Sequence, residues 1–418
     1  MSTGLYRENG PAGFWRLQVD PQPSDLEWAG AVVAAAAALP EPARRKWDGS
    51  IETLLESVLG EGQFGEGHWR LGWARRLYYA VKPRIPLRLR LRLRRWHRRL
   101  AESDFPLGWP IEPRYAQFQW ATLAHLLRQR GERQAPFIHF WPGGGRWAFV
   151  LTHDVETAEG QRHVRKLAAL EGEYGFRSAF NFVAEGYPLD RGLIEDLRRD
   201  GFEIGVHGLR HDGSLFASQV GFLLQAARIN EWMLTMGAEG FRSPLMHRHP
   251  AWMQALAIGY DMSFFDTDPY EPLPGGTMSI WPFWTGRFLE LPTTLAQDHT
   301  LTAVLGERDP RLWLQKIAFI EKYCGLALLN AHPDYLLEPD NWNLYRSFLE
   351  VIRERAEQPW HALPREVARW WRSRHEAQSI AELPQAGMAR FVVDESGGDV
   401  VISRPKQDGF ARPALTAG

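Results

Sequence analysis

Short apolar runs alternate with amphipathic segments from about residue 146 onward. The runs have the length and aromatic or β-branched content of buried strands, and they cover residues 147–152, 178–183, 202–206 and 326–330. Helical patterns, with apolar residues three and four positions apart, lie between them at residues 164–170, at 190–200 and after Ser214. Strands that alternate with helices form parallel sheets with crossover helices. The pattern therefore predicts an α/β domain over residues 146–375.

The remainder of the chain divides into three segments with different sequence patterns. Residues 1–80 have helix-former composition, as in 29–39 and 51–59, and predict a helical N-terminal extension. Residues 81–145 form a connecting segment that begins with a strongly basic stretch. Residues 376–418 form a tail with a possible hairpin, in which 390–393 and 399–403 flank Ser396-Gly397-Gly398.

Leucine and arginine alternate strictly from Leu87 to Arg94, within a basic stretch that runs from Arg84 to Arg99. One interpretation is a patch for anionic lipid, or for the phosphates of a lipid- or nucleotide-linked sugar, which would allow peripheral membrane contact. The other is a solvated basic face that pairs with acidic groups elsewhere. The sequence leaves both open.

Composition narrows the classes of function. The net charge of the 418 residues is -1, so no global field favours nucleic acid. Cys324 is the single cysteine, which excludes an internal disulfide and fits a reducing compartment. No basic head precedes an apolar run at the N-terminus, and residues 29–39 are shorter than the roughly 20 apolar residues of a membrane span. We expect a cytoplasmic protein without a transmembrane segment.

Reactive side chains follow four of the predicted strands. Asp154 ends FVLTHD, and His207 ends EIGVH. Arg242 follows the short apolar stretch at Phe241, and His332 ends LLNAH. In a parallel (β/α) barrel the carboxyl ends of the strands form one mouth, where the chemistry takes place. The sequence therefore predicts a single site built from these strand ends.

Two pairs of residues in this set suit a cation. His207 and His211 are four positions apart, and on a helical turn both imidazoles would reach one metal ion. Asp154 and Glu156 are two apart, so on extended backbone their carboxylates point to the same side. One could bind the metal while the other acts as base. Two histidines and a carboxylate leave open positions on a divalent ion, zinc first and other transition metals next.

The order of the motifs resembles that of a known family. Residues 146–340 contain four motifs in the same order as the NodB-homology polysaccharide deacetylases (carbohydrate esterase family 4). These motifs are T-x-D, H-x-x-x-H, R-x-P and L-x-x-H-P. The resemblance is closest to the bacterial branch with THDVE, GVHGLRHDG, GFRSPLMH and NAHPDY segments. It implies a distorted (β/α) barrel and a carbohydrate substrate.

The resemblance also implies roles for the residues at the matching positions. Asp154 matches the catalytic base, Arg242 the arginine that orients it, and His332 the general acid. The backbone N–H of Leu245 matches the oxyanion donor. The fourth motif region further implies Asp266 or Asp268 as the partner of His332. His247, beside the third motif, is either a residue of the substrate groove or a surface histidine.

Three positions depart from the family pattern. Val155 stands where the family commonly has a second, metal-binding aspartate, so Glu156 would take over as ligand in an acid-x-acid arrangement. Gly208 replaces a usual Ser or Thr, and Leu245 replaces a common Tyr.

The hypothesis that follows is a metal-dependent hydrolase that removes an N-acetyl group from a sugar or glycan intermediate. Three alternatives stay open: a catalytically impaired carbohydrate-binding relative, a hydrolase of a non-sugar amide or ureide, and a ferrous oxygenase with a two-histidine, one-carboxylate triad. Trp281 and Trp284, in the segment WPFW, are candidates for stacking on a sugar ring.

Overall fold

The structure is a computed structural model that describes residues 4–45, 47–65, 67–70, 105–393 and 400–403. The basic stretch from Arg84 to Arg99 lies outside the described residues, so both interpretations of it stay predictions. Among the described helices, none combines the length and the apolar character that crossing a membrane requires.

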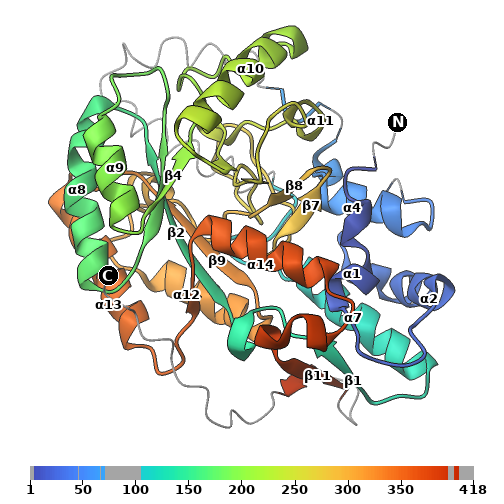
Figure 1. Ribbon diagram of the computed structural model, residues 1–418. Helices are drawn as coiled ribbons and strands as arrows, with labels where there is room; N and C mark the ends of the chain where they lie inside the picture. The colour runs from blue at the N-terminus through green and yellow to red at the C-terminus, as the bar shows by residue number, and fades with distance from the viewer. Residues whose placement is uncertain (1–3, 46, 66, 71–104, 394–399, 404–418) are drawn as a thin grey trace.

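A nine-stranded sheet forms the centre of the protein (Figure 1). Its order is β10-β2-β3-β4-β5-β6-β8-β7, and β9 pairs with β2. Every pair is parallel except β7 with β8. The strands are β2 (Ala148–Val155), β3 (Ser178–Phe182), β4 (Glu203–Val206), β5 (Gly240–Phe241), β6 (Tyr260–Asp261), β7 (Phe283–Thr285), β8 (Phe288–Glu290), β9 (Leu326–Ala331) and β10 (Trp360–His361).

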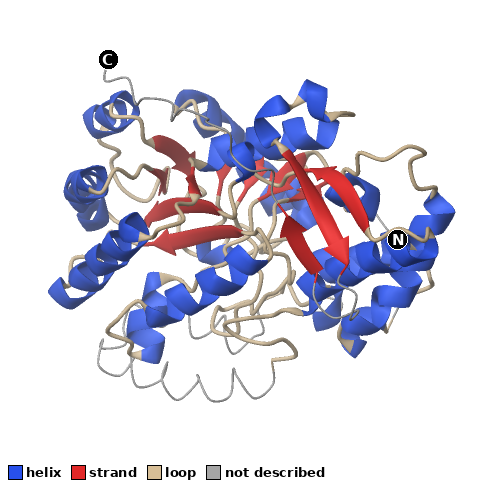
Figure 2. Cartoon of the chain, turned by 90° about the horizontal axis from the view of Figure 1, so that it is seen from below, coloured by secondary structure: helices blue, strands red, loops and turns tan. Residues whose placement is uncertain are grey.

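Helices surround this sheet, as Figure 2 shows from below. Side-chain oxygens of Thr157, Asp190 and Ser218 cap the first turns of three of them, where the sequence places these residues just before the apolar pattern. Each of these three helices buries one apolar stripe. The helices around the sheet are α8 (Ala158–Glu173), α9 (Arg191–Arg199), α10 (Gln219–Thr235), α11 (Pro250–Met253), α12 (Arg311–Lys322), α13 (Pro339–Glu354) and α14 (Pro364–Glu376).

The barrel is closed by irregular backbone between β8 and β9. The amides of Thr294 and Leu295 both donate to the carbonyl of Leu328, at 3.2 and 3.0 Å. No regular strand is assigned to this stretch of the described chain, which makes the barrel distorted. The predicted fold class, a distorted (β/α) barrel with a helical N-terminal extension, is confirmed.

The N-terminal helices share one hydrophobic core with the barrel. Trp15, Trp28 and Trp120 belong to the same buried cluster as Trp281 of the barrel. These helices are α1 (Pro11–Trp15), α2 (Asp25–Ala35), α3 (Glu41–Arg44), α4 (Ile51–Leu59) and α7 (Arg114–Gln129). Helix α7 and strand β1 (Gln134–Ile138) occupy much of the stretch predicted to be a mere connection.

A second, three-stranded sheet joins the segment that precedes β2 to the segment that follows α14. β1 pairs antiparallel with β11 (Met388–Val393), which pairs antiparallel with β12 (Val400–Ser403). The last pairing is the hairpin that the sequence indicates in the tail. Short helical turns complete the described chain: η1 (Arg7–Asn9), η2 (Ala36–Ala38), η3 (Gly62–Phe64), η5 (Pro142–Gly144), η6 (Pro244–Met246), η7 (Thr300–Leu305), η8 (Ile380–Glu382) and η9 (Pro384–Ala386).

A buried carboxylate fastens helix α8 to the sheet behind the strand end that carries Asp154. Glu171 accepts hydrogen bonds from Ser178 at 2.6 Å and from Tyr345 at 2.5 Å, and it lies 2.7 Å from Nε2 of His153. Burial alone would raise the pKa of Glu171, but the charge and hydrogen bond of His153 outweigh it and hold the pKa below its ordinary value.

We expect Glu171→Leu to lower the free energy of unfolding by about 3–5 kcal/mol, because it leaves buried donors without an acceptor. Glu173→Leu, an exposed position on the same helix, is the control and should change it by less than about 0.5 kcal/mol. A depressed carboxyl pKa stabilises the fold above the unfolded value, near 4.5, and this contribution disappears as pH falls through the folded value. Urea unfolding at pH 7 and pH 4 measures both effects, and equal losses in the two variants would contradict the expectation.

Candidate active site

Asp154 lies at the end of β2 with both carboxylate oxygens engaged. Its Oδ1 accepts hydrogen bonds from Nη1 of Arg242 at 3.1 Å and from Nδ2 of Asn181 at 3.0 Å. Its Oδ2 accepts one from Nδ2 of Asn330 at 2.8 Å. Burial would raise the pKa of Asp154, but Arg242 and two nearby imidazoles hold it well below its usual range. The group is therefore an ionised carboxylate with a fixed orientation.

Glu156, His207 and His211 come together beside Asp154. One potential ligand atom from each of the three lies within 4.8 Å of the others. Nε2 of His211 is 3.1 Å from Oε1 of Glu156, and Nε2 of His207 is 3.8 Å from Oδ2 of Asp154. The three residues that the sequence singles out as metal ligands thus surround one point.

The two histidines meet through a loop and not through the helical turn expected from their spacing. Residues 207–211 have no helical structure, and the imidazole centroids lie 5.3 Å apart. Gly208 turns the chain with φ of +68°, and a Cβ there would lie 2.6 Å from Cγ of Pro244. Backbone conformation and close packing both explain why Gly208 stands where the family that the chain resembles has Ser or Thr.

The donor atoms fit a divalent cation. Nδ1 of His207 lies 3.0 Å from the carbonyl of Arg242, which can only accept, so the ring turns its unprotonated Nε2 toward the cluster. This Nε2 is buried, and no described protein atom makes a hydrogen bond to it. Burial lowers the pKa of His207 to about 4, so the ring is a neutral ligand at physiological pH. Two imidazoles and a carboxylate form the donor set of catalytic zinc sites.

Arg242, which follows β5, binds the carboxylate of Asp154 from behind. Its Nη1 donates to Asp154 and also to Oγ1 of Thr152 at 2.9 Å and Oδ1 of Asn330 at 2.7 Å. Its Nε donates to the carbonyl of Met262 at 2.9 Å. The guanidinium is fully buried, so it orients the carboxylate but cannot reach substrate in solvent.

His332 follows β9 and faces the two acidic residues of β2. Its Nε2 lies 3.6 Å from Oε1 of Glu156 and 4.0 Å from Oδ2 of Asp154. Its Nδ1 lies 2.7 Å from Oδ1 of Asp298, which also accepts from the His332 backbone N–H through Oδ2. Burial would lower the pKa of His332, but Asp298, with Glu156 and Asp154, raises it to about 10. The ring is a protonated imidazolium, as a general acid requires.

The prediction that Asp266 or Asp268 supports His332 is wrong. Asp266 forms a buried ion pair with Lys316, and Oδ1 of Asp268 accepts from the amides of Tyr270 and Glu271. The partner of His332 is Asp298, which lies in the irregular stretch before β9. Because that stretch has no periodic pattern, its fold depends on long-range contacts that the sequence does not show.

The loop after Arg242 bends sharply and packs against the loop that carries His207 and His211. Leu245 and Met246 have φ of +59° and +53°, in the left-handed region that residues with side chains seldom adopt. No described residue accepts a hydrogen bond from the Leu245 N–H, which leaves it available to an oxyanion. His247 is buried with its Nε2 unpaired among the described residues, and burial lowers its pKa to about 4. Arg248 anchors the loop through two 2.6 Å bonds to Glu61 of the N-terminal region.

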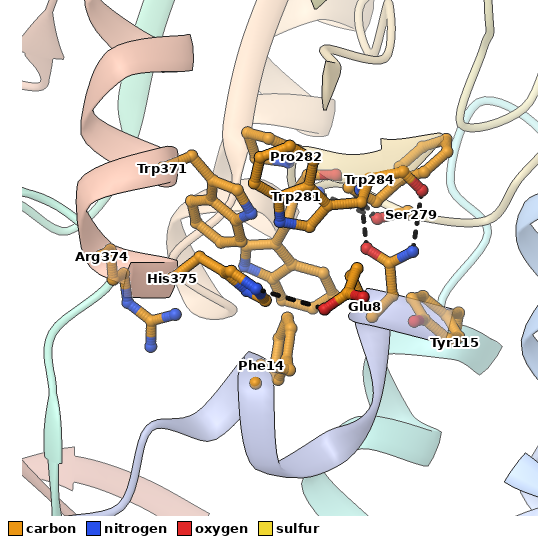
Figure 3. A pocket seen from close by; sticks show the side chains of 13 residues that line it. Glu8, Phe14, Tyr115, Ser279, Trp281, Pro282, Trp284, Trp371, Arg374 and His375 are labelled. Atoms are coloured by element: carbon orange, nitrogen blue, oxygen red, sulfur yellow. Dashed lines mark hydrogen bonds and ion pairs between the residues drawn. The ribbon is translucent and has the colours of Figure 1, made fainter. Parts of the chain in front are cut away.

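Trp281 and Trp284 are core residues and not sugar platforms. Figure 3 shows both beside Phe14 and Trp371, around a cavity of about 20 Å³. That volume holds one water molecule and no sugar ring. Trp281 is fully buried and donates through Nε1 to the carbonyl of Cys324 at 3.0 Å.

Comparisons with known proteins find matches among solved structures alone. No family model and no curated protein matches the chain. Among solved structures, it is similar to a protein named as a polysaccharide deacetylase from Mycobacterium smegmatis, with 19% identity, 56% of this chain and 92% of that chain covered, and a TM-score of 0.46. It is similar to Puue allantoinase, with 16% identity, coverage of 57% and 95%, and a TM-score of 0.46. A polysaccharide deacetylase named from Pseudomonas aeruginosa PAO1 gives 17% identity, coverage of 56% and 93%, and a TM-score of 0.43. At this identity and TM-score the likeness carries no argument about function, so a function for this chain has to rest on its own side chains.

Proposed function

We propose that the chain is a metal-dependent amide hydrolase that removes an N-acetyl group from a sugar or glycan intermediate. One observation carries the proposal. Glu156, His207 and His211 place ligand atoms within 4.8 Å of one another, and an ionised Asp154 and a protonated His332 lie directly beside them. A base, an acid and a cation site around one point are what hydrolysis of an unactivated amide needs.

A zinc ion, or another divalent transition metal, held by the triad would supply Lewis acidity to a carbonyl oxygen and acidify water. Asp154 would take the proton of the attacking water at Oδ2, because Arg242 and Asn181 occupy Oδ1. As the water oxygen bonds to the carbonyl carbon, negative charge would develop on the carbonyl oxygen, and that oxygen would accept a hydrogen bond from the Leu245 N–H.

His332 completes the reaction at the nitrogen. It would give its Nε2 proton to the departing amine as the C–N bond breaks, and acetate and an amino sugar leave. Asp298 keeps the imidazolium in place through Nδ1, so Nε2 stays turned toward Glu156 and Asp154.

The sugar and its location are proposed from the motif order and composition. A lipid- or nucleotide-linked intermediate would carry phosphates that the basic stretch from Arg84 to Arg99 could contact, and the single cysteine fits the reducing cytoplasm.

The test is acetate release by zinc-loaded protein from a panel of substrates. The panel contains UDP-N-acetylglucosamine, oligomers of N-acetylglucosamine, and a simple aryl acetamide without hydroxyl groups. We expect release from at least one sugar, its loss with a chelator, and its return with zinc. Absence of release from every sugar, or release that survives complete metal removal, would overturn the proposal.

A catalytically impaired carbohydrate-binding relative is the second candidate, favoured by Val155 at the position of the usual metal-binding aspartate. Sugar binding by protein that retains no zinc after dialysis would support it. Turnover of the aryl acetamide alone would support a non-sugar amide instead.

A further inference from the structure

A continuous chain of buried side chains runs from the base, Asp154, away from the reacting centre. Nδ2 of Asn330 donates to Oδ2 of Asp154 and also to Oε1 of Gln297, both at 2.8 Å. Nε2 of Gln297 donates to Oε1 of Glu271 at 2.8 Å. Asn330, Gln297 and Glu271 are 0%, 2% and 7% exposed, so water does not compete for these bonds.

The residues at the two ends of this series of hydrogen bonds fix which group donates and which accepts along it. Arg242 can only donate, and it donates to Oδ1 of Asn330 at 2.7 Å. Gln297 donates through its NH2 group to the Glu271 carboxyl group, so its amide oxygen faces Asn330. Both constraints give Asn330 the same orientation, with its NH2 group aimed at Asp154. A flipped Asn330 would bring an amide oxygen against the carboxylate.

The far end of the chain reaches the acid. Oε1 of Glu271 also lies 3.0 Å from Nε2 of His299. The His299 ring lies 5.4 Å from the ring of His332 and 5.6 Å from that of Tyr335. Glu271 therefore contacts one residue that leads to the base and another that packs against the acid.

We propose that Glu271 and Gln297 are positioning residues of the hydrolase site, which set the orientation of Asp154 through the Asn330 amide. The inference rests on the proposed function. Neither residue is assigned to touch substrate. They act by allowing only one arrangement of hydrogen bonds around the base, so that Oδ2 keeps a constant direction through turnover.

The test uses variants of similar side-chain size that can neither donate nor accept these hydrogen bonds. Zinc-loaded Gln297→Met and Glu271→Met are assayed on the panel substrate from which the wild-type protein releases acetate fastest. We expect kcat to fall about 10- to 100-fold in each, with KM changed less than about threefold. Either change breaks the same series of hydrogen bonds. The kcat of the double variant should therefore lie no more than about threefold below the kcat of the less active single variant.

Gln119→Met is the matched control. Gln119 is 1% exposed and donates through Nε2 to Tyr115 at 2.8 Å, in helix α7 and away from the site. It should lose stability like Gln297→Met but keep its kcat. Three outcomes would overturn the positioning role and leave the proposed hydrolase activity intact. They are a kcat of Gln297→Met within twofold of wild type, losses in kcat that multiply in the double variant, or a loss of kcat in Gln119→Met equal to that in Gln297→Met. A wild-type protein that hydrolyses nothing overturns both.

Discussion

Asp154→Asn is expected to lower kcat about a thousandfold, with zinc content unchanged. General base catalysis contributes roughly 10²- to 10⁴-fold, and asparagine cannot accept the proton. The amide also adds a misfit, because its NH2 group would face the NH2 of Asn330, which now donates to Oδ2. The effect should therefore lie in the upper half of that range.

The variant also needs a control for stability, since Arg242 would keep a buried charge without a partner. Asp266→Asn is matched, because Asp266 is a 1%-exposed carboxylate paired with the 1%-exposed Lys316, in contact with none of the catalytic residues. Thermal unfolding should show losses in both variants, and acetate release should fall only in Asp154→Asn. If Asp154→Asn keeps more than about a tenth of the wild-type kcat, Asp154 is not the base.

Most of the predicted site residues that the structure brings together follow clear strands. Asp154, His207 and His332 end apolar runs, and strands β2, β4 and β9 are buried at every position. Parallel strands bring such ends to one edge, so local pattern alone places them together. Glu156 lies with Asp154 on the same side for a similar reason, since two-residue spacing on extended backbone returns to one face.

The residues that the sequence analysis misses are the polar partners of the base and the acid. Asn181 and Asn330 are polar residues inside otherwise apolar strands, a signal that a buried hydrogen-bond role could have explained. Asp298, Gln297 and Glu271 give no such signal, because Glu271 lies in a loop and the other two lie at the start of a short helical turn, and only tertiary contacts bring them together.

Helix α7 shows a different kind of error. Leu123, Leu126 and Leu127 have helical spacing and are buried, yet the neighbouring run of arginines led to the interpretation of the whole stretch as a basic connection. The basic composition of residues 81–145 as a whole obscured the helical spacing of these leucines. The strand ends allowed the prediction that the side chains of the candidate site meet, whereas their orientation depends on residues that only the folded chain brings together.

Glu156→Ala is expected to weaken zinc binding at least about 100-fold and to abolish turnover, and adding Val155→Asp is expected not to restore either. A ligand carboxylate contributes charge and one of three protein donors, so its loss leaves only His207 and His211. Val155 stands where the family that the chain resembles has its metal-binding aspartate, but here its side chain is fully buried in the hydrophobic core. Successive side chains of a strand point to opposite faces, so an aspartate at 155 would be buried away from the triad.

Zinc titration against a chelating dye measures the affinity, and urea unfolding of the same samples measures the fold. Glu156→Asp is the graded comparison, since it keeps the charge on a side chain one methylene shorter, and it should bind zinc with intermediate affinity. The Val155→Asp change should cost stability whether or not Glu156 is present, because it buries a carboxylate among apolar side chains. If the double variant Val155→Asp/Glu156→Ala binds zinc like the wild-type protein and releases acetate, the carboxylate ligand is interchangeable between the two positions, and the assignment of Glu156 by its side of the strand is wrong.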